Sequence, residues 1–386
     1  MRIAMVHSSF ALLGGAEQYV RDLSRDLEAR GHEVRVFARA SANAQPGDGV
    51  LSTRVSARVP RARKLFTHLG DVFDPTGAGP ADLRDFAPDV VHVHNWQGIG
   101  ALPVAALARA HAVVHTVHDY AIADPNNALA NRGRSGPLDR LLDLRSAWLV
   151  RRLRRVTTLW PAARTRDLLA AHVPGARRLP GRVVPLAVPE SMGSDWPPGR
   201  RDVLLFMGAL SPHKGIEVLL EAWRAVGPEV GATLLVAGDG PARAAVEAAA
   251  AADPTLRYLG FLDAAGKAAA LAEAGWLVFP SQWVENFPIS CVEALRAGRP
   301  IISSAIARPP MASAGSVVEF TDTATLAGAV RQAVLSTDAQ YAAFAASAAD
   351  DGVRLDWPAH VDAVLEAYHA VAGARTGRPG TLREHG

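Results

Sequence analysis

The stretch RIAMVHSSFALLGGAEQYVRDLSRDLEARGHEVRVFA, residues 2–38, decides the fold, because two apolar runs flank one amphipathic helical pattern. The first run covers residues 2–7 and the second covers residues 32–38. Between them an apolar stripe repeats at helical spacing, and Gly31 follows as a helix stop. The stripe consists of Ala16, Tyr19, Val20, Leu23 and Leu27. This stretch therefore predicts a strand, a helix and a second strand, which is a βαβ unit.

The same alternation continues along the rest of the chain. The first half adds the apolar runs DVVHVH, AVVHTVH and VTTLW, and a second series follows with VLLFMG, ATLLVAG, LRYLGF, GWLVFPS and PIISS. Valine-rich strands without polar alternation are typical of parallel sheets that helices cover on both faces. The pattern predicts an α/β protein with two doubly wound, Rossmann-like domains that face a central cleft. Ligands of such domains bind at the carboxyl ends of the strands.

The domain boundaries follow from length and composition. A chain of 386 residues, 49% of them hydrophobic, exceeds one ordinary core, so two domains are expected. The segment PLAVPESMGSDWPPGR, residues 185–200, is rich in proline and glycine, as an interdomain connection would be. We therefore expect an N-terminal domain over residues 1–188 and a C-terminal domain over 189–357. A helix over 358–374 is expected to cross back to the first domain, and residues 375–386 to form a tail.

Charge and cysteine content exclude several classes of protein. The formal net charge of +3 comes from 41 basic and 38 acidic residues, which gives no case for a nucleic-acid partner. Cys291 is the single cysteine, so no intramolecular disulfide forms, in keeping with a reducing cytoplasm. We interpret the N-terminal run as a mature strand and not as a signal peptide, because His7 and two serines interrupt it. No apolar segment reaches the length of about 18 residues that a membrane span requires.

Two carboxylates mark a candidate ligand site in VENFPISCVEALRAGRP, residues 284–300. Pro288 suits the first turn of a helix that Gly298 ends, with Glu285 before it and Glu293 within it. The free N–H groups and the positive dipole end of this helix suit a diphosphate, and carboxylates on either side suit sugar hydroxyls. The alternative is a surface-loop Glu285 and a solvated Glu293.

Other polar residues follow strands in both halves of the chain. Lys214 in FMGALSPHKG lies between a strand and a helix, where its ammonium group could neutralise phosphate oxygens. Gly14 and Gly15 follow the first strand, where bare backbone could approach the same phosphates. Each signal is weak alone, because glycine pairs often mark turns and lone lysines are often solvated.

In these motifs the chain resembles the GT-B glycosyltransferases of family 4. The resemblance covers GGAEQYVRDLSRDLEARGHEV, PDVVHVHN, HTVHDY, GALSPHKGIEVLLEA, VAGDGP and FPSQWVENFPISCVEALRAGRPII, in the family's order. It implies retaining, metal-independent transfer of a sugar from a UDP- or GDP-linked donor to a glycan, lipid-linked or small-molecule acceptor, as in polysaccharide biosynthesis. By this resemblance the donor sugar is held by Glu285, Asn286, Phe287 and Pro288, the ribose by Glu293, and the diphosphate by Lys214 and Gly15. The nucleotide sugar is a substrate, and no cofactor is expected.

The resemblance also implies that His118 is the active-site histidine, which contacts the donor sugar near its developing positive charge. Its position at the end of a strand favours this role, whereas His92, His94 and His115 are expected to be packed core residues. We assign Glu285 to positioning and electrostatics, not to a covalent intermediate, and Asp119 to orienting the loop or the acceptor.

The chain also departs from the family pattern. Ala209 stands where the family often has arginine, which removes one phosphate contact, and Arg308 in the segment after PIISS is a candidate replacement. The loop HDYAIADPNNALANRGRSG lacks the cysteines that the family often has there, so no metal site is expected in it. These departures leave open a slow enzyme or a binding protein for nucleotide sugars. A sugar-nucleotide epimerase or hydrolase of the same fold is a second alternative, while a Rossmann oxidoreductase is disfavoured because no G-x-G-x-x-G follows the first strand.

Residues 138–160, LDRLLDLRSAWLVRRLRRVTTLW, combine leucines and a tryptophan with several arginines. Such a segment suits an anionic membrane surface, which would place the enzyme on the inner face of the membrane beside a lipid-linked acceptor. A buried amphipathic helix with a solvated basic edge is the alternative.

Overall fold

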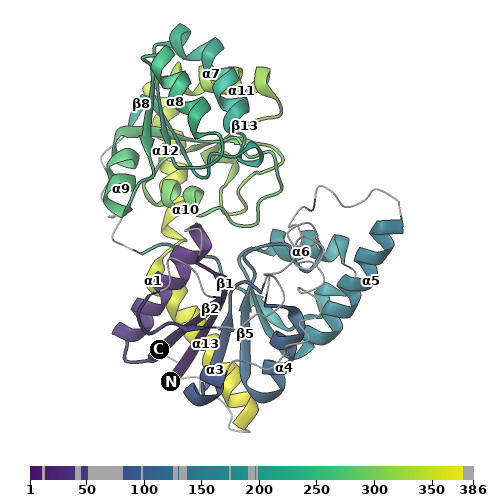
Figure 1. Cartoon of the computed structure of the whole chain (residues 1–386). Coiled ribbons are helices and arrows are strands. Elements are labelled where there is room, and N and C mark those ends of the chain that lie inside the picture. Colours follow the sequence, from purple (N-terminus) through teal and green to yellow (C-terminus); the bar gives the residue numbers. More distant parts are fainter. Residues whose placement is uncertain are drawn as a thin grey trace. The chain divides into compact units, whose positions relative to one another are not determined.

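A computed structural model shows two compact α/β units (Figure 1). The structure describes residues 1–10, 14–39, 45–50, 81–96, 99–124, 129, 137–173, 175–189, 196 and 199–376. Unit 1 contains Met1–Pro185 and the chain from Pro358 onward, and unit 2 is Leu186–Trp357. The division falls at residues 185/186, three residues before the predicted boundary at 188/189.

Unit 1 is built on a seven-stranded sheet in the order β3-β2-β1-β4-β5-β6-β7, and its paired strands are parallel. The strands are β1 Arg2–Ser9, β2 Glu33–Arg39, β3 Gly49–Val50, β4 Val90–Val93, β5 Ala112–Thr116, β6 Thr157–Trp160 and β7 Gly181–Val183. The predicted βαβ unit is present as β1, α1 (Gly15–Ala29) and β2. The central strands β4 and β5 are fully buried, which explains why they are rich in valine and show no polar alternation.

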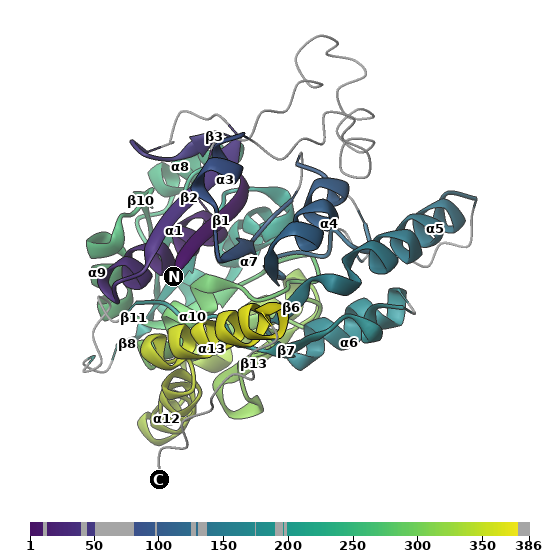
Figure 2. The ribbon, with the colours of Figure 1, turned by 90° about the horizontal axis from the view of Figure 1, so that it is seen from below.

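The remaining helices of unit 1 are α3 Ala81–Phe86, α4 Ala101–Ala110, α5 Pro137–Arg152, α6 Ala163–His172 and α13 Trp357–Thr376, with short 3-10 turns η2 Leu153–Arg155 and η3 Ala176–Arg178. Figure 2 shows α13, in yellow, running alongside the other elements of this unit. Its Tyr368 hydroxyl lies 2.6 Å from Nδ1 of His92 on β4, and Arg182 on β7 bonds to Glu366. The last helix of the chain therefore packs on the N-terminal sheet. It ends two residues into the predicted tail, and residues 377–386 lie outside the described part.

Unit 2 contains a six-stranded sheet in the order β10-β9-β8-β11-β12-β13, again with parallel pairing. Its strands are β8 Arg200–Met207, β9 Thr233–Ala237, β10 Leu256–Gly260, β11 Ala274–Phe279, β12 Ile301–Ser304 and β13 Val317–Phe320. Its helices are α7 Ile216–Val230, α8 Arg243–Ala252, α9 Ala264–Glu273, α10 Ile289–Arg296, α11 Thr323–Val334 and α12 Asp338–Val353, with turns η5 Pro212–Lys214 and η6 Ala314–Ser316. Trp223 of α7 and Val330 of α11 are buried in one core with Leu204 and Trp276 of the sheet.

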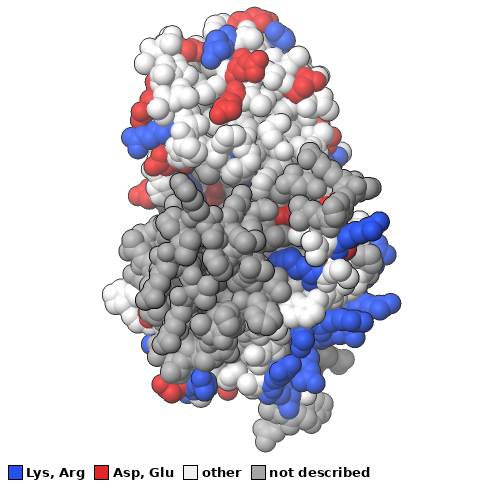
Figure 3. Space-filling model, turned by 45° about the vertical axis from the view of Figure 1, so that its right-hand side comes forward, with Lys and Arg blue, Asp and Glu red and all other residues white. Residues whose placement is uncertain are grey.

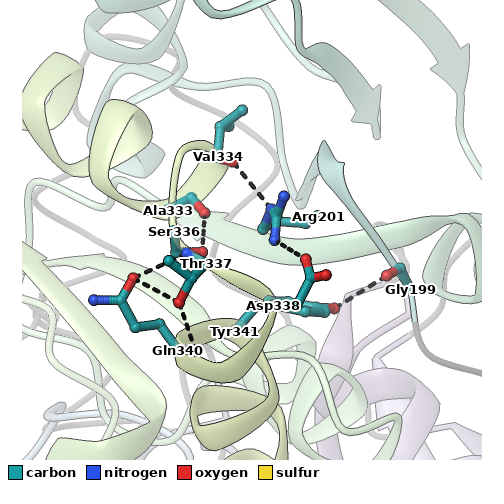
Figure 4. Close-up of polar contacts among 9 residues, drawn as sticks. All are labelled: Gly199, Arg201, Ala333, Val334, Ser336, Thr337, Asp338, Gln340 and Tyr341. Carbon is teal, nitrogen blue, oxygen red and sulfur yellow. Dashed lines mark hydrogen bonds and ion pairs between the residues drawn. The ribbon is translucent and has the colours of Figure 1, made fainter.

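Helix α12 is tied to the amino ends of the central strands of unit 2 (Figure 4). Thr337 and Gln340 form a capping box at its start. The Tyr341 hydroxyl lies 3.3 Å from the carbonyl oxygen of Gly199 and 3.2 Å from that of Gly275, which are backbone groups at the starts of β8 and β11. These contacts anchor the amino ends of the strands. The predicted donor site lies at the other edge of the sheet, at the carboxyl ends of the strands.

Candidate functional site

The predicted donor residues of unit 2 gather around the start of helix α10. Strand β11 ends at Phe279, and α10 begins at Ile289 with Pro288 as its N-cap, without a capping side chain. Asn286 and Phe287 are buried just before the helix. Cys291, Val292, Ala294 and Leu295 are buried along it and fix its orientation on the sheet. The amino end of α10 therefore carries N–H groups that no side-chain cap satisfies.

Lys214 and Glu285 form an ion pair beside this helix end. The Lys214 Nζ lies 2.7 Å from Oε1 of Glu285, and the Ser281 hydroxyl donates to the same oxygen at 2.7 Å. The Glu285 side chain is only 10% exposed, which excludes the alternative of a surface-loop carboxylate. These two candidate residues, 71 positions apart in the chain, therefore lie in direct contact. The contact from Ser281 was not predicted.

A glycine explains how Lys214 reaches this place. Gly215 follows η5 with φ of 75°, in the left-handed region that favours glycine. A Cβ atom there would lie 1.8 Å from the carbonyl oxygen of Pro280. The turn after β8 can therefore approach the end of β11 only if residue 215 has no side chain. This close approach places Lys214 beside Glu285.

Glu293 has a partner that sequence reasoning missed. The Nζ of Lys267, on α9, lies 2.8 Å from Oε1 of Glu293. The Glu293 side chain is 8% exposed, so the alternative of a solvated helix residue is wrong. A buried carboxylate on this helix is stabilised by a nearby cation. A lysine on a separate helix gives no signal in the local motif, which explains why the sequence did not reveal it.

The candidate replacement for the missing arginine, Arg308, forms an ion pair with a glutamate. Arg308 Nη1 is 2.7 Å from Oε1 of Glu319 on β13. Its guanidinium group is thus engaged with a carboxylate of the neighbouring strand. In this structure Lys214 is the cation that accompanies Glu285, and Ala209 adds no charge.

In unit 1, Gly14 and Gly15 form the start of α1, with Gly14 as its N-cap. Glu17 stabilises this turn, because one carboxylate oxygen accepts the Gly14 N–H at 3.0 Å and the other lies 2.9 Å from Nε2 of His7 at the end of β1. Residues 11–13 lie outside the described part. The contact between His7 and Glu17 was not predicted, although both residues lie in the βαβ stretch 2–38.

His118 follows β5 at the carboxyl edge of the sheet in unit 1. It is partly exposed, and its Nε2 lies 3.2 Å from Nδ1 of the buried His94. Burial lowers the pKa of His118 to about 3, so the imidazole is neutral at pH 7. The side chains of His92, His94 and His115 are buried, as expected of core residues. Asp119 accepts the backbone N–H of Ala121 at 2.9 Å, which orients the loop after His118.

Residues 138–160 form most of α5, then η2 and the whole of β6. Leu149, Val150 and Leu153 are buried, whereas Leu141 and Leu144 are 64% and 69% exposed. The arginines at positions 140, 151, 152, 154 and 155 are exposed, and Figure 3 shows blue side chains gathered on one part of the surface. The guanidinium carbon of Arg152 lies 5.1 Å from the ring centroid of Trp148. One face of the segment is therefore core, and the other is a basic surface with exposed leucines.

Comparison with known proteins identifies the family. A model of the glycosyl transferase 4-like domain matches residues 14–187, and a model of glycosyl transferases group 1 matches residues 201–336. The two matches coincide closely with the two units of the structure. The chain belongs to glycosyltransferase family 4. It is a glycosyltransferase of the hexosyltransferase type that uses a nucleotide-sugar donor.

Two relatives in the family match this glycosyltransferase over almost its whole length. A GDP-mannose-dependent alpha-mannosyltransferase of Mycolicibacterium smegmatis is 29% identical over 97% of this chain and 99% of that protein. A phosphatidyl-myo-inositol mannosyltransferase of Mycobacterium leprae is 28% identical over 96% of this chain and 97% of that protein.

Solved structures confirm the GT-B fold. Sucrose-phosphate synthase from Thermosynechococcus elongatus superposes with a TM-score of 0.70 at 18% identity, covering 97% of this chain and 99% of the other. HepE of Anabaena, in complex with UDP and glucose, superposes with a TM-score of 0.70 at 16% identity, covering 96% of this chain and 100% of the other. The prediction of two Rossmann-like domains of the GT-B class is therefore correct.

Within the described part of the chain, no helix has the length and apolar character of a membrane span. The described side chains also contain no group of three or more His, Cys, Asp or Glu residues arranged to hold a metal ion. Much of the loop after Asp124 lies outside that part, so the prediction that it has no metal role stays a prediction.

Proposed function

We propose that this enzyme transfers a hexose from a nucleotide-diphospho-sugar to an acceptor hydroxyl with retention of anomeric configuration and without a metal ion. The observation that carries the proposal is the ion pair of Lys214 and Glu285 beside the uncapped start of α10. An ammonium group and free helix N–H groups together suit a diphosphate. A neighbouring carboxylate suits the hydroxyls of the sugar attached to it.

The transition state of glycosyl transfer explains why these groups matter. The sugar becomes oxocarbenium-like while negative charge grows on the departing diphosphate. Preorganised donors at the leaving group stabilise that charge without having to reorganise. Lys214 supplies one full positive charge, and the first turn of α10 supplies N–H donors. Glu285 orients the sugar and favours its developing positive charge, while the leaving phosphate takes the proton from the acceptor hydroxyl.

The ribose end of the donor is assigned to Glu293. Its carboxylate is held in place by Lys267, and the pair lies further along α10 than the helix start. A carboxylate accepts hydrogen bonds from both vicinal hydroxyls of a ribose. Glu293 and Lys267 together therefore favour a nucleoside diphosphate over a bare pyrophosphate.

Unit 1 contributes the other proposed contacts. Gly14 and Gly15 present backbone without side chains at the start of α1, where the Gly14 N–H already donates to Glu17. His118 presents a neutral imidazole at the end of β5. We assign the glycines to the diphosphate and His118 to a substrate hydroxyl. These assignments rest on the family resemblance and on the positions of the residues at the carboxyl edge of the sheet.

The relatives support a choice of donor and acceptor. The first is named for its dependence on GDP-mannose, and the second for transfer of mannose to phosphatidyl-myo-inositol. HepE was solved with UDP and glucose. We propose a GDP- or UDP-linked hexose as donor, with GDP-mannose favoured, and a glycan or lipid-linked acceptor. A cytoplasmic enzyme whose α5 surface contacts the inner face of the membrane would suit a lipid-linked acceptor.

A turnover assay tests the proposal. Purified enzyme is incubated with a panel of GDP- and UDP-sugars, acceptor lipids and EDTA, and the product anomer is read by NMR. We expect transfer with the anomeric configuration of the donor, and a loss of about 100-fold or more in Glu285→Gln, as for other groups that stabilise a developing charge. Delivery of the sugar only to water would instead identify a hydrolase. Full activity of Glu285→Gln, loss of activity in EDTA, or inversion would each contradict the corresponding part of the proposal.

A further inference from the structure

His118 contacts a network of buried rings in unit 1. His94 follows β4 and His118 follows β5, and because these strands are adjacent and parallel, their carboxyl ends bring the two imidazoles together. Nδ1 of His94 lies 3.2 Å from Nε2 of His118. On its other side, Nε2 of His94 lies 3.3 Å from the sulfur of Met5 on β1. His94 thus bridges a thioether and the proposed active-site imidazole.

The chemistry of these atoms fixes where the protons are. A thioether sulfur carries no proton and can only accept, so Nε2 of His94 must be the donor in its contact with Met5. Burial lowers the pKa of His94 well below its usual value, so the ring is neutral and holds only one proton. Nδ1 of His94 is therefore a lone-pair acceptor, and Nε2–H of His118 must donate to it. Since His118 is neutral as well, its Nδ1 also presents a lone pair.

A third ring holds this pair in place. The ring of Tyr19, on α1, packs edge-on with its centroid 5.7 Å from that of His94 and 5.3 Å from that of His118. The Tyr19 hydroxyl lies 2.8 Å from Nε2 of His360 on α13, and Nδ1 of His360 lies 2.7 Å from the carbonyl oxygen of Pro185. The C-terminal helix therefore helps to set the position of a ring that contacts His118.

We propose that His94 is a positioning residue, which holds His118 as the neutral Nε2–H tautomer so that its Nδ1 accepts a hydrogen bond from a substrate hydroxyl. This inference rests on the proposed function, which places His118 against the substrate. In this arrangement His118 orients the sugar or the acceptor as a hydrogen-bond acceptor and does not act as a general acid at neutral pH.

Two matched substitutions at position 94 test the proposal. In His94→Asn the side-chain oxygen can take the place of Nδ1 and still accept from His118. In His94→Gln the amide reaches the place of Nε2, and the acceptor beside His118 is lost. We expect the Asn variant to keep most of the wild-type kcat. We expect kcat of the Gln variant to fall by about tenfold or more, as when the partner that orients a metal-bound imidazole is removed.

Folding and substrate assignment are checked in the same experiment. Thermal unfolding of both variants shows whether they fold, and Met5→Leu, which removes only the sulfur acceptor, provides a third and milder perturbation. A change in KM for the donor or for the acceptor shows which substrate carries the hydroxyl. Equal kcat values in folded Asn and Gln variants, or greater activity in the Gln variant, would overturn the inference.

The variant His118→Ala tests the proposed substrate contact of His118 separately from the positioning role of His94. If it loses activity while the two variants at position 94 remain equal, only the role of His94 is wrong. If His118→Ala retains full turnover, His118 has no substrate contact to position, and both its assigned role and the present inference are overturned.

Discussion

The buried His115 makes the free energy of unfolding of unit 1 depend on pH. Burial lowers the pKa of His115 to about 3, and its ring stacks on Trp96 with centroids 4.5 Å apart. The unfolded chain binds this proton near pH 6.5, so the stabilisation is complete above that pH and is lost as the pH falls towards 3. In His115→Phe, which keeps a ring, the slope of unfolding free energy against pH should decrease by about 1.4 kcal/mol per pH unit between pH 6 and 4.

Urea unfolding at several pH values measures this slope. The exposed His369, replaced by Gln, provides a control whose slope should match the wild type. An unchanged slope in His115→Phe would show that the ring does not resist protonation in the folded state.

At the residue scale, the sequence selected candidate site residues but predicted few of their contacts. Lys214 and Glu285 were both selected, and they meet directly. Lys267, Ser281 and Glu17 were missed, because each acts through a partner that lies on another element or across a turn. Such contacts depend on tertiary packing, which local motifs do not encode. The substrate roles of the selected residues stay predictions.

At the scale of the element, α5 and η2 carry the proposed membrane contact. Four exposed arginines lie at positions 151, 152, 154 and 155, and two leucines near the start of α5 are exposed. Each arginine close to an anionic bilayer contributes about 1 kcal/mol of binding. Replacing the four by glutamine should therefore abolish binding to liposomes rich in anionic lipid, as measured by cosedimentation at low and physiological salt.

The control for this prediction replaces four exposed arginines of unit 2, at positions 200, 224, 243 and 257, and thus makes the same change in net charge. Liposome binding should survive in that control. If the wild type does not bind anionic liposomes, or if both variants bind like the wild type, α5 is simply a core helix with a solvated basic edge.

Elements were predictable where their pattern is strong. The βαβ unit at the N-terminus, the helix that begins after Pro288 and the last helix of the chain all lie where the periodicity placed them. The short edge strands β3 and β7, with two and three residues, were not predicted. Strands of this length have no periodicity to read, and the neighbouring strand determines where they form.

At the scale of the whole molecule, the fold class and the family followed from the order of motifs along the chain. The division between the units was predicted within three residues, because proline and glycine gather where few contacts cross. The number of strands in each sheet was not predicted, since it depends on which segments pair at the edges.

The most direct test of the account is calorimetric titration of GDP and UDP into the wild-type enzyme and Lys214→Met, with EDTA present. Lys214→Met is also combined with Glu285→Gln. In the single variant the Glu285 carboxylate loses its lysine partner and could repel the nucleotide, and the double variant removes that effect. A charge-assisted hydrogen bond is worth about 1.5–3 kcal/mol. The account predicts that the preferred nucleotide binds the wild type and binds about tenfold or more weakly without Lys214, in both backgrounds. Equal affinity with and without the Lys214 ammonium group would contradict it.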